Sequence, residues 1–332
     1  MRRGLALAVT LLVAVGLVAV GARRTDDRGA GAPPTTAPSA PPPSEPSAST
    51  TATTTDSTTA PAGPVSCRTV RYTPPGGSAL AGDLCAPAHP HHGVGIVVVH
   101  GGGGYAGDRH SSPAWVDAFD AAGYLTFAVD YRLFRLGDRG PVYPRQESDV
   151  KVAVQWLRSH AADLAIDPDR IVVQGVSAGA QLGGALLVTP DDPYFDAQKR
   201  WPGTSDRIDG FIGMYGYYDG FQLQPATVYG GPRDSGDPQV ADRWHRADSM
   251  AKAASASGPA ILFHAADDSI IAADQTKRFA AALDAAGRDV EATIVPSGGH
   301  GFDRPGGPTL SPQGEEVART VLAWLDRHFP ES

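Results

Sequence analysis

The sequence contains few cysteines and has no excess of basic residues, and both shortages exclude classes of protein. Only 2 of its 332 residues are Cys, too few for a disulfide-rich scaffold or a four-cysteine zinc site. Its 28 Lys and Arg residues are outnumbered by 36 Asp and Glu, so we expect no nucleic-acid partner. The 39 Gly and 29 Pro follow no Gly-X-Y period, which excludes a collagen-like chain.

The first 64 residues have the composition of a targeting segment and a linker. Arg2 and Arg3 precede an uncharged apolar stretch over residues 5–22. This pattern predicts a signal peptide over residues 1–22, with an uncleaved N-terminal membrane anchor as the alternative. Residues 23–64 are rich in Pro, Thr, Ser and Ala, and we expect a disordered linker, because such side chains cannot offset the entropy lost on ordering. The protein is therefore expected outside the cytoplasm, secreted or anchored to the cell surface.

The two cysteines lie almost symmetrically about Gly76. Cys67 precedes and Cys85 follows the turn sequence of residues 74–77, so both occupy facing positions of an expected antiparallel hairpin. In an oxidising compartment we expect them to form a disulfide. Two buried free thiols are the alternative.

Short apolar runs alternate with amphipathic stretches from residue 94 onward. This alternation predicts an α/β fold with a mostly parallel central sheet and helices on both faces, in a single domain over residues 65–332. Ligands of such sheets bind at the carboxyl ends of the strands, so catalytic residues are expected directly after strands. The expected strands are 94–99, 124–129, 170–175, 208–214, 260–264 and 290–295, and the expected helices are 115–122, 146–162, 178–188, one ending at Gly287 and one containing Val317 to His328.

Residues 216–246 interrupt the alternation with a short aromatic-rich insertion. Such an insertion after a strand is expected to be a lid or a wall of the substrate pocket, or else a surface excursion with its own small apolar cluster. The pattern does not choose between these interpretations.

The sequence Gly175-Val176-Ser177-Ala178-Gly179 follows one predicted strand and begins a predicted helix. This is the context of the G-x-S-x-G turn, which exposes a serine hydroxyl at the edge of the sheet and needs glycines to make room for it. The pattern predicts that Ser177 is a nucleophile.

The sequence His100-Gly101-Gly102-Gly103-Gly104 directly follows the first buried strand. Glycines allow the backbone N–H groups to approach a ligand closely, and together with the N–H of Ala178 they predict an oxyanion hole. A phosphate-binding loop is the alternative, but the Lys-Ser/Thr pair of a P-loop is missing.

The base and the acid of a serine triad are expected after Ser177, in the order acid and then histidine. His300 lies in a glycine-flanked loop after the strand 290–295, and its position favours it over His245, His264 and His328. Asp267 and Asp268 both follow the strand 260–264, and their spacing alone does not separate them.

These residues resemble the α/β-hydrolase fold, and most closely its esterase/lipase branch with an H-G-G-G oxyanion loop, including acetyl-esterase-like and BD-FAE-like enzymes. The resemblance implies the triad Ser177, Asp268 and His300, with Asp267 a neighbour of the acid. It places the oxyanion donors on Gly102, Gly103 and Ala178. It extends over residues 66–330 and is carried by residues 100–103, 130–133, 143–157, 166–171, 175–179, 264–271 and 299–302.

The resemblance implies a serine carboxylic-ester hydrolase that forms an acyl-enzyme and needs no cofactor or metal. Its expected partner is a small-molecule ester, with membrane contact only through the N-terminal segment. An amide hydrolase of the arylformamidase or peptidase type is the first alternative, because the same triad serves both reactions. A non-catalytic binding module is the second. The sequence does not indicate an oligomeric state.

Overall fold

The computed structural model describes residues 65–73, 79–135, 138, 141–195, 201–222, 224–304 and 307–331. The predicted signal peptide, the predicted linker and the turn around Gly76 lie outside the described residues. Among the residues that are described, no helix is both long and apolar enough to span a membrane.

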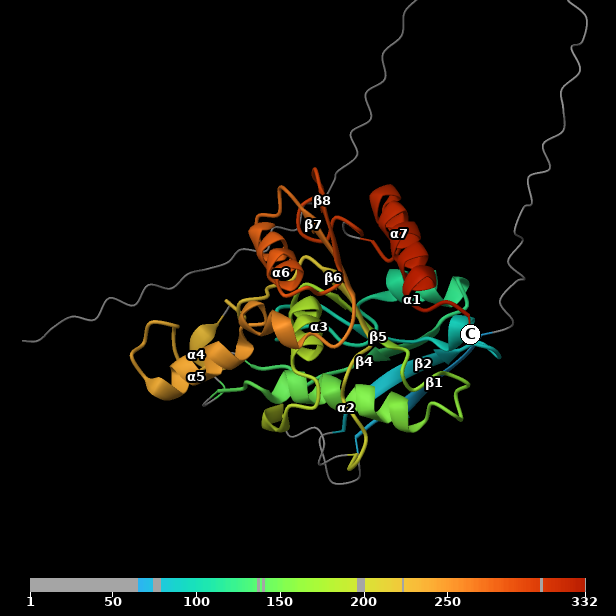
Figure 1. Ribbon diagram of the computed structural model, residues 1–332, viewed down its shortest axis with the longest axis horizontal. Helices are drawn as coiled ribbons and strands as arrows, with labels where there is room; N and C mark the ends of the chain where they lie inside the picture. Colours follow the sequence, from blue (N-terminus) through green and yellow to red (C-terminus); the bar gives the residue numbers. More distant parts are fainter. Residues whose placement is uncertain are drawn as a thin grey trace, which may run out of the picture. The chain divides into compact units, whose positions relative to one another are not determined.

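Eight strands form one sheet in the order β1-β2-β4-β3-β5-β6-β7-β8 (Figure 1). β1 pairs with β2 and β2 pairs with β4 in antiparallel fashion, whereas all the other neighbours are parallel. The mostly parallel sheet predicted from the alternation is confirmed. The strands are β1 Ser66–Arg71, β2 Ala81–Ala86, β3 Gly95–Val99, β4 Leu125–Val129, β5 Ile171–Val176, β6 Gly210–Met214, β7 Ala260–Ala265 and β8 Val290–Val295.

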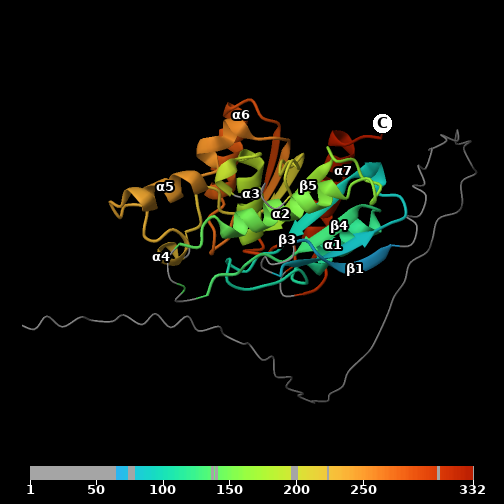
Figure 2. The same cartoon turned by 90° about the horizontal axis from the view of Figure 1, so that it is seen from below.

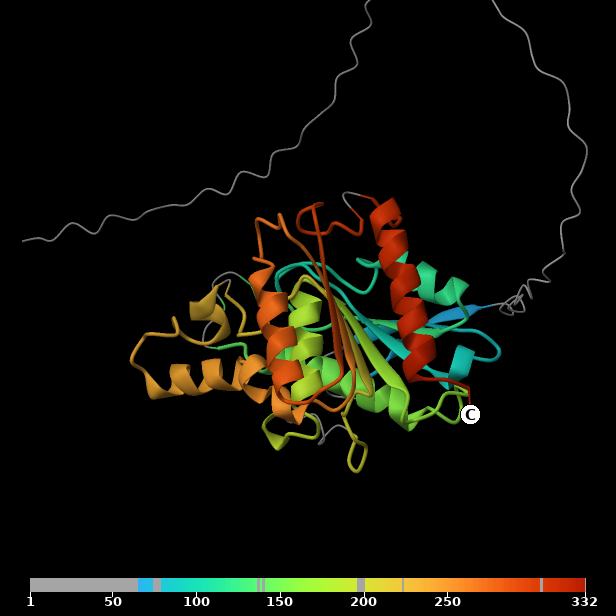
Figure 3. The ribbon, with the colours of Figure 1, turned by 45° about the horizontal axis from the view of Figure 1, so that its top comes forward.

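Helices cover both faces of the sheet, as Figure 3 shows. Successive strand side chains point to opposite faces, so Val97 belongs to the apolar cluster that includes residues of α2, α3 and α6, while Val98 belongs to the cluster that includes residues of α1 and α7. Both faces of the central strands are therefore buried, which explains their uninterrupted apolar runs. The helices are α1 Pro113–Ala121, α2 Arg145–Ser159, α3 Ala178–Val188, α4 Pro225–Val228, α5 Pro238–Ala247, α6 Asp274–Ala285 and α7 Pro312–His328, with 3-10 turns at His91–Gly93, Pro193–Phe195 and Met250–Ser255.

Two helices in the insertion were missed by the sequence analysis. α4 and α5 lie beside each other, away from α7 (Figures 1 and 2). α5 begins where Pro238 occupies the first turn and the Asp237 carboxylate accepts a hydrogen bond from the N–H of Gln239 at 2.8 Å. These are ordinary helix-start signals, and they identify α5 within the aromatic-rich stretch.

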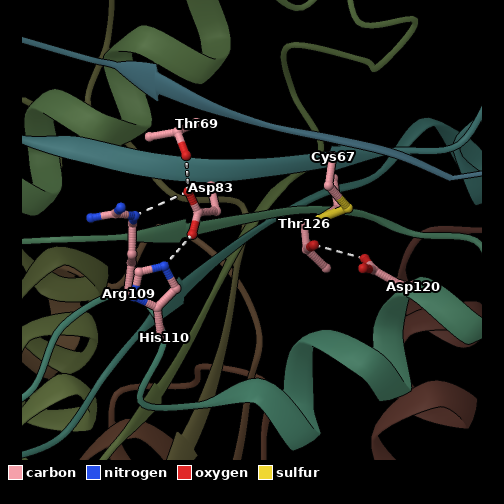
Figure 4. The surroundings of a disulfide bond; sticks show 8 residues. Cys67, Thr69, Asp83, Arg109, His110, Asp120 and Thr126 are labelled. Atoms are coloured by element: carbon pink, nitrogen blue, oxygen red, sulfur yellow. Dashed lines mark hydrogen bonds and ion pairs between the residues drawn. A yellow bond between two sulfur atoms is a disulfide. The ribbon is translucent and has the colours of Figure 1, made fainter.

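The β1–β2 hairpin is closed by a disulfide. Its register places Cys67 opposite Cys85, and the two sulfur atoms are bonded, as the symmetric spacing predicted (Figure 4). The alternative of two buried free thiols is wrong, because Cys67 is exposed and bonded. Beside the disulfide, the Asp83 carboxylate accepts a hydrogen bond from Thr69 at 2.6 Å and pairs with Arg109 at 3.0 Å.

Candidate active site

Ser177 occupies the sharp turn between β5 and α3. Its backbone is strained, with φ of 53° and ψ of −117°. A Cβ on Gly175 would lie 2.3 Å from the carbonyl oxygen of Gly179, and a Cβ on Gly179 would lie 2.1 Å from that of Val99. Only glycine fits at these two positions, which is the steric requirement that the sequence pattern implied.

Ser177, His300 and Asp268 form a continuous chain of hydrogen bonds. The Oγ of Ser177 lies 2.9 Å from Nε2 of His300, and Nδ1 of His300 lies 2.8 Å from Oδ2 of Asp268. The Asp268 side chain is fully buried, whereas that of His300 is 17% exposed and can reach a ligand. The three residues follow β5, β7 and β8, whose parallel carboxyl ends lie at the same edge of the sheet.

The two adjacent aspartates, which spacing could not separate, have different partners. Asp268 contacts the imidazole of His300, and its second oxygen accepts the N–H groups of Ile270 and Ile271 at 2.8 and 2.9 Å. Asp267 instead accepts the N–H groups of Gly298 and Gly299, at 3.2 and 2.8 Å. The hydrogen bond from Gly299 lowers the pKa of the Asp267 carboxyl. Asp267 therefore binds the backbone of the histidine loop, and Asp268 binds the histidine side chain.

His264, expected only as a less favoured candidate for the base, lies behind the acid. It is fully buried, and its Nε2 lies 3.2 Å from Oδ2 of Asp268 and 2.9 Å from the carbonyl oxygen of Ile271. Nδ1 lies 2.8 Å from Oγ1 of Thr276. Burial lowers the pKa of His264, so the ring is neutral, with Nε2–H donating and Nδ1 accepting. The four-residue spacing from His264 to Asp268 is the feature of the sequence that could have indicated this contact.

The glycine-rich loop after β3 lies beside Ser177 and accepts a hydrogen bond from a side chain of α2. Gly101, Gly102 and Gly103 line the same cavity as Ser177, and Gly102 and Gly103 have φ of 107° and 62°. Within the described part of the chain, the N–H groups of Gly102, Gly103 and Ala178 donate no backbone hydrogen bond, so they remain free for a ligand. The buried Gln146 side chain donates to the carbonyl oxygen of Gly104 at 2.8 Å and stabilises the loop.

His100 orients this loop, and among the described residues its Nε2 has no hydrogen-bond partner. Its Nδ1 lies 2.6 Å from the carbonyl oxygen of Gly101, and its ring stacks on Tyr131 with centroids 4.3 Å apart. Burial lowers the pKa of His100, which keeps the ring neutral.

Tyr215 supports the other side of His300, and no sequence signal identified it. Its ring packs edge-on against the imidazole of His300, with centroids 4.8 Å apart. Its hydroxyl donates to the buried Asp303 at 2.8 Å, and the indole of Trp115 donates to the same carboxylate at 2.7 Å. Burial, followed by the Asp303 charge, raises the pKa of the Tyr215 phenol well above its usual range.

A cavity of about 420 Å³ opens in front of the Ser177 hydroxyl. Tyr217 and Phe221 of the insertion line this cavity, together with Ile270 and Ile271. Tyr229, Val240 and Trp244 belong to the same buried cluster as Tyr217 and Phe221, a cluster distinct from those on the two faces of the sheet. Both interpretations of the insertion therefore apply, because its first residues form a cavity wall and also pack with its helices in one small apolar cluster.

Two groups of side chains within the described residues come close enough to share a metal ion. One consists of Cys67, Cys85 and Asp120, whose sulfur atoms are already joined to each other, and the other of His91, His92 and Glu331. Neither group contains a residue that lines the cavity.

A serine–histidine–aspartate chain at the carboxyl ends of parallel strands, under a glycine-rich loop, defines the class of α/β-hydrolases with a serine nucleophile. Within that class the chain belongs to the BD-FAE family, in the esterase/lipase branch. The family model matches residues 83–283, more than half of the chain.

Several known proteins are similar to this chain. Esterase LipC of Mycobacterium tuberculosis is 26% identical over 235 residues, which cover 67% of this chain and 56% of LipC. Ethyl acetate hydrolase of Pseudomonas putida is 29% identical over 253 residues, which cover 71% of this chain and 74% of that enzyme. The chain therefore spans little more than half the length of LipC.

Solved structures share the fold. The acetyl ester-xyloside bifunctional hydrolase of Caldicellulosiruptor lactoaceticus has a TM-score of 0.60 at 24% identity, with 74% of this chain and 88% of that chain covered. Esterase 2 of Thermogutta terrifontis, phosphorylated by paraoxon, has a TM-score of 0.64 at 21% identity, with 79% and 94% covered. These similarities show the α/β-hydrolase fold.

Proposed function

We propose that the protein is a serine carboxylic-ester hydrolase with the triad Ser177, His300 and Asp268. The observation that carries the proposal is the pair of contacts made by His300, 2.9 Å to the Ser177 hydroxyl and 2.8 Å to the Asp268 carboxylate, at the edge of the cavity. Membership of the BD-FAE family and similarity to proteins named esterases support it.

The proposed reaction follows from these contacts. Nε2 of His300 accepts the proton of Ser177 while Oγ bonds to the ester carbonyl carbon. The N–H groups of Gly102, Gly103 and Ala178 are the proposed donors to the oxyanion. His300 then returns the proton to the leaving alcohol as the C–O bond breaks, which leaves an acyl-enzyme. Water hydrolyses the acyl-enzyme by the same proton transfers in the opposite direction. Asp268 stabilises the imidazolium in both halves.

We further propose that the protein acts outside the cytoplasm, secreted or tethered to the cell surface. The signal-like composition of residues 1–22 and the disulfide between Cys67 and Cys85 support this location. Fractionation of expressing cells, with detection of the N-terminal residue of the exported chain, tests both the location and the cleavage.

The triad is tested by comparing Ser177→Ala with the wild type on a panel of p-nitrophenyl esters of increasing acyl length. We expect kcat to fall by about 10⁴-fold or more, because the nucleophile is removed. Ser159→Ala on the exposed end of α2 is the matched control and retains wild-type turnover. A fluorophosphonate probe is expected to label the wild type and not Ser177→Ala.

Two results would change the proposal. Full ester turnover by Ser177→Ala removes the triad assignment. Faster turnover of a p-nitroanilide than of the matched p-nitrophenyl ester replaces the ester with an amide as the substrate class.

A further inference from the structure

One permanently charged side chain lines the cavity in front of Ser177. Among the described residues that form the wall, Arg304 is the single arginine, and the wall contains no lysine, aspartate or glutamate. Tyr217, Phe221, Ile270 and Ile271 line the same cavity. The cavity therefore combines an aromatic and aliphatic side with one guanidinium group.

Arg304 is positioned by contacts that do not neutralise it. Its Nη1 donates to the carbonyl oxygen of Ser111, and its backbone N–H donates to the carbonyl oxygen of Gly301 at 3.0 Å. Arg304 also lowers the pKa of the Tyr215 phenol, against the effect of burial, which places its positive charge beside that ring. The guanidinium is thus tied to Ser111 and the Arg304 backbone to Gly301, and both of these residues line the cavity.

The carboxylates close in sequence to Arg304 and to its partner Ser111 are bound to other groups. The Asp303 carboxylate accepts hydrogen bonds from Trp115 and Tyr215, and the Asp108 carboxylate accepts them from Ser111 and His110. Within the described ranges, Arg304 forms no ion pair. The positive charge in the cavity wall therefore has no anionic partner from the described chain.

A half-buried guanidinium beside an apolar wall binds an anion more strongly than a group in open solvent does. The guanidinium has five N–H donors in a planar fork that matches the two oxygens of a carboxylate, and the Ser111 carbonyl accepts from one of its nitrogens. A low local dielectric increases the attraction, and part of the desolvation cost of Arg304 is already incurred on folding.

We propose that Arg304 forms a carboxylate-binding subsite, so that the preferred substrates are esters carrying a negatively charged carboxylate in the acyl or the alcohol group. This inference rests on the proposed ester hydrolysis and specifies its substrate class. The carboxylate pairs with Arg304 while the apolar part of the ester packs against Tyr217 and Phe221.

The test compares matched anionic and neutral esters within each variant, so that any general loss of activity cancels. One pair is p-nitrophenyl hemisuccinate and p-nitrophenyl butyrate, with the charge in the acyl group. The other is 3-carboxyphenyl butyrate and phenyl butyrate, with the charge in the alcohol. An acetylated neutral sugar forms a third arm. The variants are Arg304→Gln, Arg304→Lys and the control Arg327→Gln, which changes an exposed arginine on α7 paired with Glu291.

For each pair of esters, the measured quantity is kcat/KM for the anionic ester divided by kcat/KM for the matched neutral ester. We expect this ratio to fall about tenfold to hundredfold in Arg304→Gln for at least one of the two pairs. Arg304→Lys should lie between Arg304→Gln and the wild type, because it keeps the charge and loses the fork. Arg327→Gln should leave the ratio unchanged. The inference is overturned if the ratio in Arg304→Gln stays within about twofold of the wild-type ratio for both pairs of esters. It is also overturned if Arg304→Gln lowers kcat/KM for the acetylated neutral sugar alone.

These outcomes separate the inference from the proposed function. If neutral esters are hydrolysed in a Ser177-dependent way and the anionic-to-neutral ratio of kcat/KM does not depend on Arg304, the proposed function stands and the subsite is refuted. If the wild type hydrolyses none of the esters, the proposed function fails. The subsite is then tested by NMR titration of Ser177→Ala with monomethyl succinate, where adding Arg304→Gln should weaken binding about tenfold; equal binding refutes the subsite. Circular dichroism and thermal unfolding confirm that each variant is folded.

Discussion

Replacing each of the two adjacent aspartates by asparagine should have sharply different effects on catalysis. In Asp268→Asn, the amide oxygen can still accept the N–H groups of Ile270 and Ile271, which contact Oδ1 at 2.8 and 2.9 Å. The amide NH₂ then faces Nδ1 of His300 in place of the Oδ2 that lies 2.8 Å away. A donor at this position forces the ring proton onto Nε2, which can no longer accept the proton of Ser177.

The expected size of this effect is large because the wrong tautomer removes the base without unfolding the site. The same carboxylate-to-amide change in serine proteases lowers kcat about 10⁴-fold, equivalent to about 5.5 kcal/mol of transition-state stabilisation. The amide introduced by Asp268→Asn would also face Nε2–H of His264, which adds a clash between two donors inside a buried cluster.

Asp267→Asn should have a much smaller effect. Asp267 is exposed, and its carboxylate accepts hydrogen bonds from the backbone N–H groups of Gly298 and Gly299 in the histidine loop. One amide oxygen remains to accept the stronger bond from Gly299, so we expect kcat/KM to fall less than about tenfold. The loss should come from poorer positioning of His300, with its protonation unchanged.

The assay is the measurement of kcat and KM on a short-chain p-nitrophenyl ester for both variants, the wild type and Ser177→Ala. Near-ultraviolet circular dichroism checks that the packing around His300 is native. If Asp267→Asn loses more than about 10³-fold while Asp268→Asn keeps a tenth of the activity, the assignment of the triad acid is wrong.

The remaining predictions concern stability. Burial raises the pKa of Glu147 to about 7, above its usual 4.5, so we expect the free energy of unfolding of the wild type to fall by about 3 kcal/mol relative to that of Glu147→Gln as the pH rises from 4.5 to 7. Urea unfolding of the wild type and Glu147→Gln across this pH range measures the difference. If the free energies of unfolding of the two proteins change in parallel with pH, the prediction is contradicted. Glu316→Gln, which changes an exposed glutamate, is the control. The disulfide closes a loop with a sequence separation of 18, so changing Cys67 and Cys85 to Ser should lower the free energy of unfolding by about 3 kcal/mol. A reductant should destabilise the wild type and leave the double variant unaffected. If the reductant changes the stability of the two proteins equally, the disulfide between Cys67 and Cys85 is refuted.

The insertion shows where local pattern is insufficient. Its aromatic residues are alike in the sequence and share one buried cluster, yet Tyr217 and Phe221 also line the cavity, whereas Tyr229 and Trp244 pack on each other with ring centroids 4.2 Å apart and do not line it. Each assignment depends on which distant element covers the side chain. Hydrophobicity indicates that such residues pack against something, and only the fold decides what that is.

The sequence by itself determined the elements whose causes are local. Buried strands follow from short apolar runs, and the turn that exposes Ser177 follows from Gly175 and Gly179, because their steric requirement acts between neighbouring residues and the strand beside them. The spacing of residues did not separate the two aspartates; the family resemblance implied Asp268, and the tertiary structure shows its contact with His300. The tertiary structure alone decided that His264 supports Asp268 and that Tyr215 packs against the imidazole. Those contacts join loops after different strands, and their geometry is set by the register and twist of the whole sheet, which no stretch of sequence contains.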